Sequence, residues 1–191
     1  MTRLDTALVA LAAVLALGGA GILGALLPGY SHLAHPLALP GAAGLPRALA
    51  FNLAVFVLPG ALLAAFAWRL RSRLPDAAGA SARLGSSMLL LSALGYASQG
   101  LLPLDMEAPD AGASRLHAVA WTLWWIAFLA GAALMAVRLP ALRMAAIAAW
   151  LLVFGLGIVM PGLLGQGISQ RLAFGAWFAW MAWAGAALRG R

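Results

Sequence analysis

The chain contains no cysteine and no lysine, and only five of its 191 residues are acidic. The absence of cysteine excludes disulfide bonds, thiolate nucleophiles, iron–sulfur clusters, cysteine-ligated zinc and c-type haem attachment. Charged residues make up 9% of the chain, against about 25% in an ordinary soluble domain. A chain with so few charges cannot cover itself with polar surface in water, which argues against a soluble protein.

Long apolar runs occupy most of the chain, and 64% of its residues are hydrophobic. A helix needs about 20 apolar residues to cross a hydrocarbon core of about 30 Å. Leu- and Ala-rich runs without strand alternation favour helices over a barrel. Six runs approach this length: residues 6–27, 48–68, 84–102, 116–137, 142–160 and 172–188. The sequence therefore predicts an all-α, polytopic membrane protein, a single domain with a bundle of six transmembrane helices.

The first run also has some features of a signal peptide. Arg3 precedes it, and Gly18, Gly19 and Ala20 are small residues of the kind found at cleavage sites. The apolar run continues to Leu27, which is longer than the roughly 7 to 15 apolar residues of a signal peptide. We therefore interpret it as a membrane span.

The twelve basic residues are all arginine, and they lie unequally at the two ends of the predicted spans. A net charge of +7 would suggest nucleic acid in a soluble protein, but arginines beside membrane spans are orientation signals, so we expect no nucleic-acid partner. Nine fall on one side and three on the other: Arg3, Arg69, Arg71, Arg73, Arg83, Arg138, Arg143, Arg189 and Arg191, against Arg47, Arg115 and Arg171. The larger group predicts that both termini face the cytoplasm, in an inner membrane.

This threading gathers most of the remaining polar groups at the extracytoplasmic end. They include every histidine and three of the five acids: His32, His35, Asp105, Glu107, Asp110 and His117. Polar side chains within a membrane span usually face the bundle interior. We therefore predict an outward-facing polar pocket built around Asp105, His117 and Arg171, above a floor formed by residues of the second and third runs: Asn52, Ser92, Tyr96 and Gln99.

Three interpretations of this polar patch are open. In the structural one, Asp105 pairs with Arg171 and His117 bonds a loop carbonyl. In the second, the patch binds a lipid-like or amphiphilic molecule: Arg171 fixes an anionic group, the face of Ser92, Tyr96 and Gln99 supplies hydrogen bonds, and the apolar bundle holds the tail.

The third interpretation is a metal-dependent membrane hydrolase. His32 and His35, spaced H-x-x-H, would hold zinc together with His117 or Asp105 and leave one position for an activated water, with an acid such as Glu107 as the base. A bare H-x-x-H is a weak signal. We therefore predict a non-enzymatic protein without a cofactor that binds an amphiphile or supports a membrane assembly. Its expected partners are membrane lipids and either another membrane protein or a second copy, and the zinc hydrolase is the alternative.

Several short motifs occur in an order that resembles a known family. They are Gly29-Tyr30-Ser31, His32 to Pro36, Asn52 and Pro59, Leu102-Pro103-Leu104-Asp105 followed by His117, and Gly167 to Arg171 before a Trp-bearing last run. Together they resemble a bacterial six-helix membrane family known only as domain of unknown function 998. The resemblance implies an integral membrane protein in which Asp105, His117 and Arg171 match family positions, and it implies no reaction. The sequence departs from the family pattern at Leu37 to Gly41, which is more apolar than expected.

Overall fold

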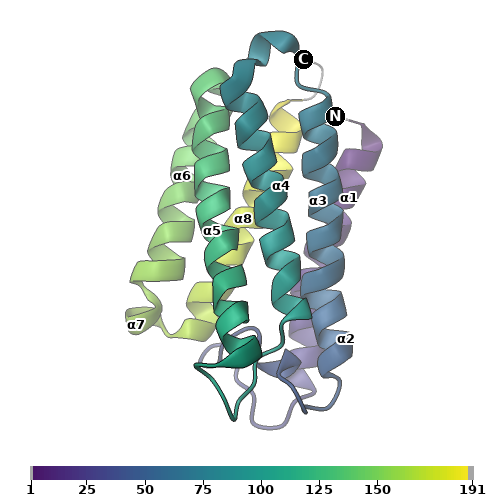
Figure 1. Cartoon of the computed structure of the whole chain (residues 1–191), viewed down its shortest axis with the longest axis vertical. Helices are drawn as coiled ribbons and strands as arrows, with labels where there is room; N and C mark the ends of the chain where they lie inside the picture. The colour runs from purple at the N-terminus through teal and green to yellow at the C-terminus, as the bar shows by residue number, and fades with distance from the viewer. Residues whose placement is uncertain (1, 189–191) are drawn as a thin grey trace.

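The computed structural model describes residues 2–188, and within them the chain forms six long helical segments and no strand (Figure 1). The prediction of an all-α chain is therefore confirmed. The elements are α1 (Arg3–Ala25), η1 (Leu39–Gly41), α2 (Ala48–Asn52), η2 (Leu53–Val57), α3 (Leu58–Ser72), η3 (Asp76–Ala78), α4 (Gly79–Leu101), α5 (Gly112–Arg138), η4 (Pro140–Leu142), α6 (Arg143–Phe154), η5 (Gly155–Val159), α7 (Pro161–Leu164) and α8 (Gln166–Ala187).

Four helical segments are long and apolar enough to cross a membrane by length and composition, namely residues 3–25, 48–72, 112–138 and 140–159. Residues 48–72 combine α2, η2 and α3 into one helical segment, and residues 140–159 combine η4, α6 and η5. The remaining two long helices, α4 and α8, carry more polar residues, including Ser92 and Gln99 in α4 and Gln166 and Arg171 in α8. The predicted number of six spans therefore stays a prediction.

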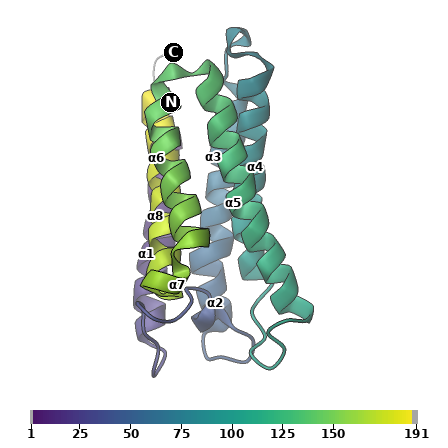
Figure 2. The ribbon, with the colours of Figure 1, turned by 90° about the vertical axis from the view of Figure 1, so that its left-hand side faces the viewer.

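The six segments pack as an antiparallel bundle, in which each segment contacts the next and α8 returns to contact both α6 and α1 (Figures 1 and 2). One end holds the start of α1, the turn between α3 and α4, the turn between α5 and α6, and the end of α8. We call this the termini end. The opposite end, which we call the loop end, holds the connections at residues 26–47, 102–111 and 160–165.

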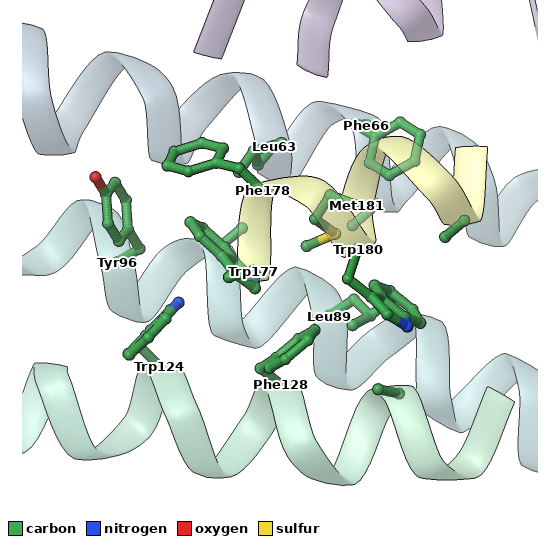
Figure 3. Close-up of a cluster of buried hydrophobic side chains, with 14 of the residues drawn as sticks. Leu63, Phe66, Leu89, Tyr96, Trp124, Phe128, Trp177, Phe178, Trp180 and Met181 are labelled. Atoms are coloured by element: carbon green, nitrogen blue, oxygen red, sulfur yellow. The ribbon is translucent and has the colours of Figure 1, made fainter. Parts of the chain in front are cut away.

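The core is rich in aromatic side chains that α8 contributes between α3, α4 and α5 (Figure 3). Trp177 of α8 lies against Tyr96 of α4 and Trp124 of α5, with ring centroids 4.8 and 5.7 Å apart. All three rings are buried. The outer surface is apolar as well, and leucine, isoleucine and valine side chains are exposed along most helices. A protein that is apolar both inside and outside is suited to a lipid environment.

Pro59 interrupts the hydrogen bonding of the second segment. Proline has no backbone N–H, so the carbonyl four residues earlier, that of Val55, loses its helical donor. The chain adopts a π-helical turn at Leu53–Val57 just before the proline. The Tyr96 hydroxyl of α4 donates to the Val55 carbonyl at 2.8 Å and satisfies it. The segment therefore continues past the proline as a single rod.

Candidate functional site

A cavity of about 240 Å³ lies at the loop end, between α4, α5, α8 and the 36–38 segment. Most of its wall is apolar and aromatic. Four polar side chains, all of them glutamine or histidine, complete it. The lining residues are Pro36, Leu37, Ala38, Phe56, Gln99, Leu104, His117, Ala118, Trp121, Gln166, Gln170 and Phe174.

His117 lies in the second turn of α5 and closes the end of α4. Its Nδ1 lies 3.0 Å from the Gln99 carbonyl and 2.9 Å from the Leu102 carbonyl. The last carbonyls of a helix lack intrahelical donors. Because both neighbours are acceptors, Nδ1 carries the proton and donates, and Nε2 on the far side of the ring is an acceptor. The structural interpretation of the patch predicted a carbonyl partner for His117 of this kind.

The side chain of Gln99 is the unusual group of this cavity. It is 1% exposed, and its Nε2 has no hydrogen-bond partner within residues 2–188. A buried donor left unpaired costs about 1 to 3 kcal/mol, so such groups call for an explanation. Gln99 is one of the residues that line the cavity.

The loop that covers the cavity is held by α8. The side-chain Oε1 of Gln170 accepts a hydrogen bond of 2.8 Å from the backbone N–H of Leu37. The backbone N–H of Ile168 donates to the Leu33 carbonyl at 3.1 Å. These two bonds fix the 33–37 segment against the first turns of α8, so the first loop of the chain and its last helix form one wall together.

Three of the predicted floor residues have backbone partners instead of a place in the cavity wall. Ser92 donates to the Trp124 carbonyl at 2.9 Å, and Tyr96 donates to the Val55 carbonyl as described above. Asn52 donates to the Gly41 carbonyl at 2.8 Å. All three side chains are buried. Of the four predicted floor residues, Gln99 alone lines this cavity, and aromatic rings form much of the remaining wall.

Arg171 and Asp105 lie outside the cavity wall and do not pair with each other in the described part of the chain. Arg171 instead donates to the hydroxyl of Tyr30, to the Gly167 carbonyl at 2.8 Å and toward His32 Nδ1 at 3.3 Å. Asp105 Oδ1 accepts from the backbone N–H of Glu107 at 2.9 Å. The Asp105–Arg171 pair of the structural interpretation is not formed among residues 2–188, because each group finds partners close to itself.

Tyr30 connects the first loop to Arg171 of α8. We call this group of side chains the Arg171 cluster and define it as Tyr30, His32, His35 and Arg171. Burial raises the pKa of the Tyr30 hydroxyl, although the nearby Arg171 guanidinium opposes the shift. The hydroxyl therefore keeps its proton at neutral pH, donates to the Pro36 carbonyl at 3.1 Å and accepts from Arg171. The cluster fixes the first loop to α8.

The residues considered as zinc ligands are divided between two places. His32 and His35 belong to the Arg171 cluster, where His35 Nδ1 accepts the backbone N–H of Ser31 at 3.0 Å. His117 lies in the cavity wall. Between residues 2 and 188 no group of three or more His, Cys, Asp or Glu side chains is arranged to hold a metal ion. The structure therefore places the histidines of the zinc alternative apart from one another.

A protein-family model matches residues 10–187, which is nearly the whole chain. The chain belongs to the DUF998 family of proteins of unknown function. This confirms the family resemblance drawn from the ordered motifs. No curated protein and no solved structure matches this DUF998 chain.

Sequence reasoning missed the aromatic wall of the cavity in this DUF998 protein. Phe56, Trp121 and Phe174 lie on three different segments and meet only in the folded bundle. Within an apolar run, an aromatic residue that lines a cavity has the same sequence signal as one that packs in the core. The polar residues Gln166 and Gln170, which lie i and i+4 at the start of the last helix, were the available signal.

Proposed function

We propose that the chain crosses the inner membrane of a bacterium six times, with both termini in the cytoplasm, and binds a lipid-like molecule in the cavity at the loop end. The proposed role is non-enzymatic. The observation that carries the proposal is the buried amide of Gln99, which lines the cavity and has no hydrogen-bond partner in residues 2–188.

The packing of α4 and α8 supports six spans. These helices contain 23 and 22 residues, and at a rise of 1.5 Å per residue they are about 33 Å long, enough for a hydrocarbon core of about 30 Å. In α4, the hydroxyls of Ser92 and Tyr96 donate to backbone carbonyls of neighbouring segments inside the bundle. A span that carries polar groups is tolerated when other helices cover those groups.

The distribution of arginine supports the orientation. Seven arginines lie at the termini end within the described residues, namely Arg3, Arg69, Arg71, Arg73, Arg83, Arg138 and Arg143, while Arg189 and Arg191 lie outside them. The loop end has Arg47, Arg115 and Arg171. The excess favours a cytoplasmic termini end, so the cavity would open toward the outer face.

Gln99 and His117, two of the four polar residues in the cavity wall, indicate which headgroup fits. The Gln99 amide offers a donor, and Nε2 of His117 offers an acceptor because Nδ1 donates to the carbonyls of α4. A hydroxyl group accepts from the first and donates to the second. The remaining wall, with Phe56, Trp121 and Phe174, suits an apolar ring or chain. We therefore propose a neutral amphiphile that carries a hydroxyl group.

The proposal is tested by native mass spectrometry of protein extracted with its lipids in a mild neutral detergent. Wild-type protein should retain a stoichiometric amphiphile. Gln99→Leu, which removes the unpaired donor and keeps the side-chain bulk, should bind it roughly 5- to 140-fold more weakly and so retain much less of it, as expected for a buried hydrogen bond worth about 1 to 3 kcal/mol. Ser98→Ala is the matched control, because Ser98 bonds within its own helix and does not line the cavity.

A steric variant on α5 tests the cavity without altering α4, the helix that carries Gln99. Ala118 lines the cavity and Val119 beside it does not. Ala118→Phe should expel the amphiphile, whereas Val119→Phe should retain it. Equal retention in wild type, Gln99→Leu and Ala118→Phe would contradict the proposal.

A further inference from the structure

A second cavity, of about 270 Å³, lies at the termini end of the bundle. We call it the termini-end cavity. Its apolar wall is formed by Phe66 and Leu70 of α3, Leu74 of the following turn, Leu139 after α5 and Leu188 after α8. Arg73 and Arg138 also line it. An apolar space bordered by guanidinium groups has the two parts that a charged amphiphile requires.

The acid in the wall of this cavity is already neutralised. Asp5 is 2% exposed and forms ion pairs with Arg69 and Arg73. It also accepts the backbone N–H of Thr2 at 2.8 Å. In the wall, Asp5 and Arg73 therefore balance each other, and Arg138 supplies the excess positive charge.

Arg138 differs from the arginines around it because its guanidinium has no hydrogen-bond or ion-pair partner in residues 2–188. Arg71 donates to the Arg83 carbonyl at 2.9 Å, and Arg83 pairs with Asp76. Arg143 donates to the carbonyls that end α5. Arg138 occupies the last turn of α5, where a cation is favoured by the helix dipole, yet its donors are free for a ligand.

We propose that the termini-end cavity binds the anionic headgroup of a membrane lipid. The forked guanidinium of Arg138 matches a carboxylate or a phosphate oxygen pair, and Arg73 adds positive charge. The acyl chain lies along Leu70, Leu74 and Leu139. Because the excess of arginine marks this end as cytoplasmic, the lipid is drawn from a leaflet whose anionic headgroups attract such clusters.

This site is separate from the candidate site at the loop end. The two cavities share no lining residue, and the proposed ligands differ in charge. The inference rests on the proposed function only for the membrane orientation. Failure of one site therefore leaves the other testable.

The test is native mass spectrometry of detergent-purified protein titrated with lysophosphatidylglycerol, with oleate, with zwitterionic lysophosphatidylcholine and with inorganic phosphate. The two anionic amphiphiles offer a phosphate or a carboxylate, and either one binding supports the site and identifies its source. Arg138→Gln should raise the dissociation constant for that anion about tenfold or more. Arg143→Gln, the control of equal charge at the same end, should change it less than about twofold.

A second variant tests the apolar part without altering charge. Ala77 is exposed and lines the cavity, so Ala77→Phe places a ring in the space of the acyl chain and should weaken binding to a similar extent. The proposal is overturned if Arg138→Gln and Arg143→Gln weaken binding equally, or if lysophosphatidylcholine or inorganic phosphate binds as tightly as the tighter of the two anionic amphiphiles. Gln99→Leu should leave this binding unchanged.

Discussion

Tyr96 and Gln99 lie three positions apart on α4, and both are almost fully buried. They differ in whether the fold satisfies their polar atoms. The Tyr96 hydroxyl donates a hydrogen bond to the Val55 carbonyl, which lacks its helical donor because residue 59 is proline. The Gln99 amide has no partner for its Nε2 in residues 2–188. At the scale of single residues, the first group therefore stabilises the bundle, and the second lowers its stability unless a ligand is present.

We expect Tyr96→Phe to destabilise the protein by about 1 to 3 kcal/mol, because the buried Val55 carbonyl loses its donor and gains none. Thermal unfolding in detergent micelles measures the change. Tyr30→Phe is the comparison, since Tyr30 lies in a partly exposed loop and its loss should cost less. An equal cost for the two variants would contradict the role assigned to the Tyr96 hydroxyl.

Gln99→Leu should have the opposite effect on ligand-free protein. Replacing an unpaired buried amide with an apolar side chain of similar size removes a penalty of about 1 to 3 kcal/mol. Unfolding of delipidated protein should therefore occur at higher temperature in this variant than in the wild type. If delipidated Gln99→Leu unfolds earlier than wild type, the amide has a structural partner in solution and the proposed binding role loses its basis.

At the scale of elements, α4 and α5 approach closely where each helix carries a glycine. A Cβ on Gly85 would lie 2.9 Å from the Gly131 carbonyl oxygen, and a Cβ on Gly131 would lie 2.9 Å from that of Gly85. Small residues at such crossings let membrane helices pack backbone to backbone. This contact therefore sets the spacing of α4 and α5 at the crossing of the two glycines.

Gly85→Ala should therefore separate the two helices and cost about 1 to 3 kcal/mol, the usual range for overpacking. Gly175→Ala on α8 is the matched control, because a Cβ there meets nothing within 4 Å and alanine favours a helix. Thermal unfolding of the two variants in the same detergent distinguishes them. A Gly85→Ala variant as stable as Gly175→Ala would show that the helices can move apart freely.

The boundaries of a helix were predictable where the helix ends with its apolar run. They were not predictable where a turn or polar residues determine the boundary. The run 116–137 lies within α5 and the run 84–102 overlaps α4 almost completely, but α8 begins at Gln166, six residues before the predicted run. The early start follows from Gly165, whose positive φ ends the preceding turn, and from polar residues that an apolar scan omits. Hydropathy detects burial in lipid, and it does not detect the polar first turns of a helix.

The choice of partners was the least predictable property. Threading by arginine led to the expectation that Asp105 and Arg171 lie at one end, and the structural interpretation of the patch paired them. Arg171 bonds Tyr30 and backbone carbonyls instead, and Asp105 bonds a nearby backbone N–H. Backbone carbonyls are present at every residue, so sequence carries no signal for which one a side chain will contact.

At the scale of the whole molecule, the bundle has two ends of different chemistry, each with its own cavity. The loop end carries the histidines, and the termini end carries most of the arginines. If the chain threads the membrane as proposed, residues at the two ends lie on opposite sides. The native sequence contains no cysteine, which makes the threading directly measurable.

Single-cysteine variants Ser72→Cys and Ala111→Cys, at exposed positions of the termini end and loop end, test this arrangement. A membrane-impermeant thiol reagent added to intact cells should label Ala111→Cys, and it should label Ser72→Cys only after the membrane is opened. Labelling of both variants in intact cells would contradict the threading. The wild type provides the background.

The ion pairs of Asp5 with Arg69 and Arg73 have a consequence for biogenesis. The acid lies in the first turn of the first helix, whereas its partners are translated more than sixty residues later. Until the second hydrophobic segment inserts, this carboxylate has no basic partner on α3, and holding an unpaired charge at the membrane is costly. The two segments are therefore expected to leave the translocon as a pair, and a nascent chain arrested before Arg69 should be a poorer membrane anchor than one that includes it.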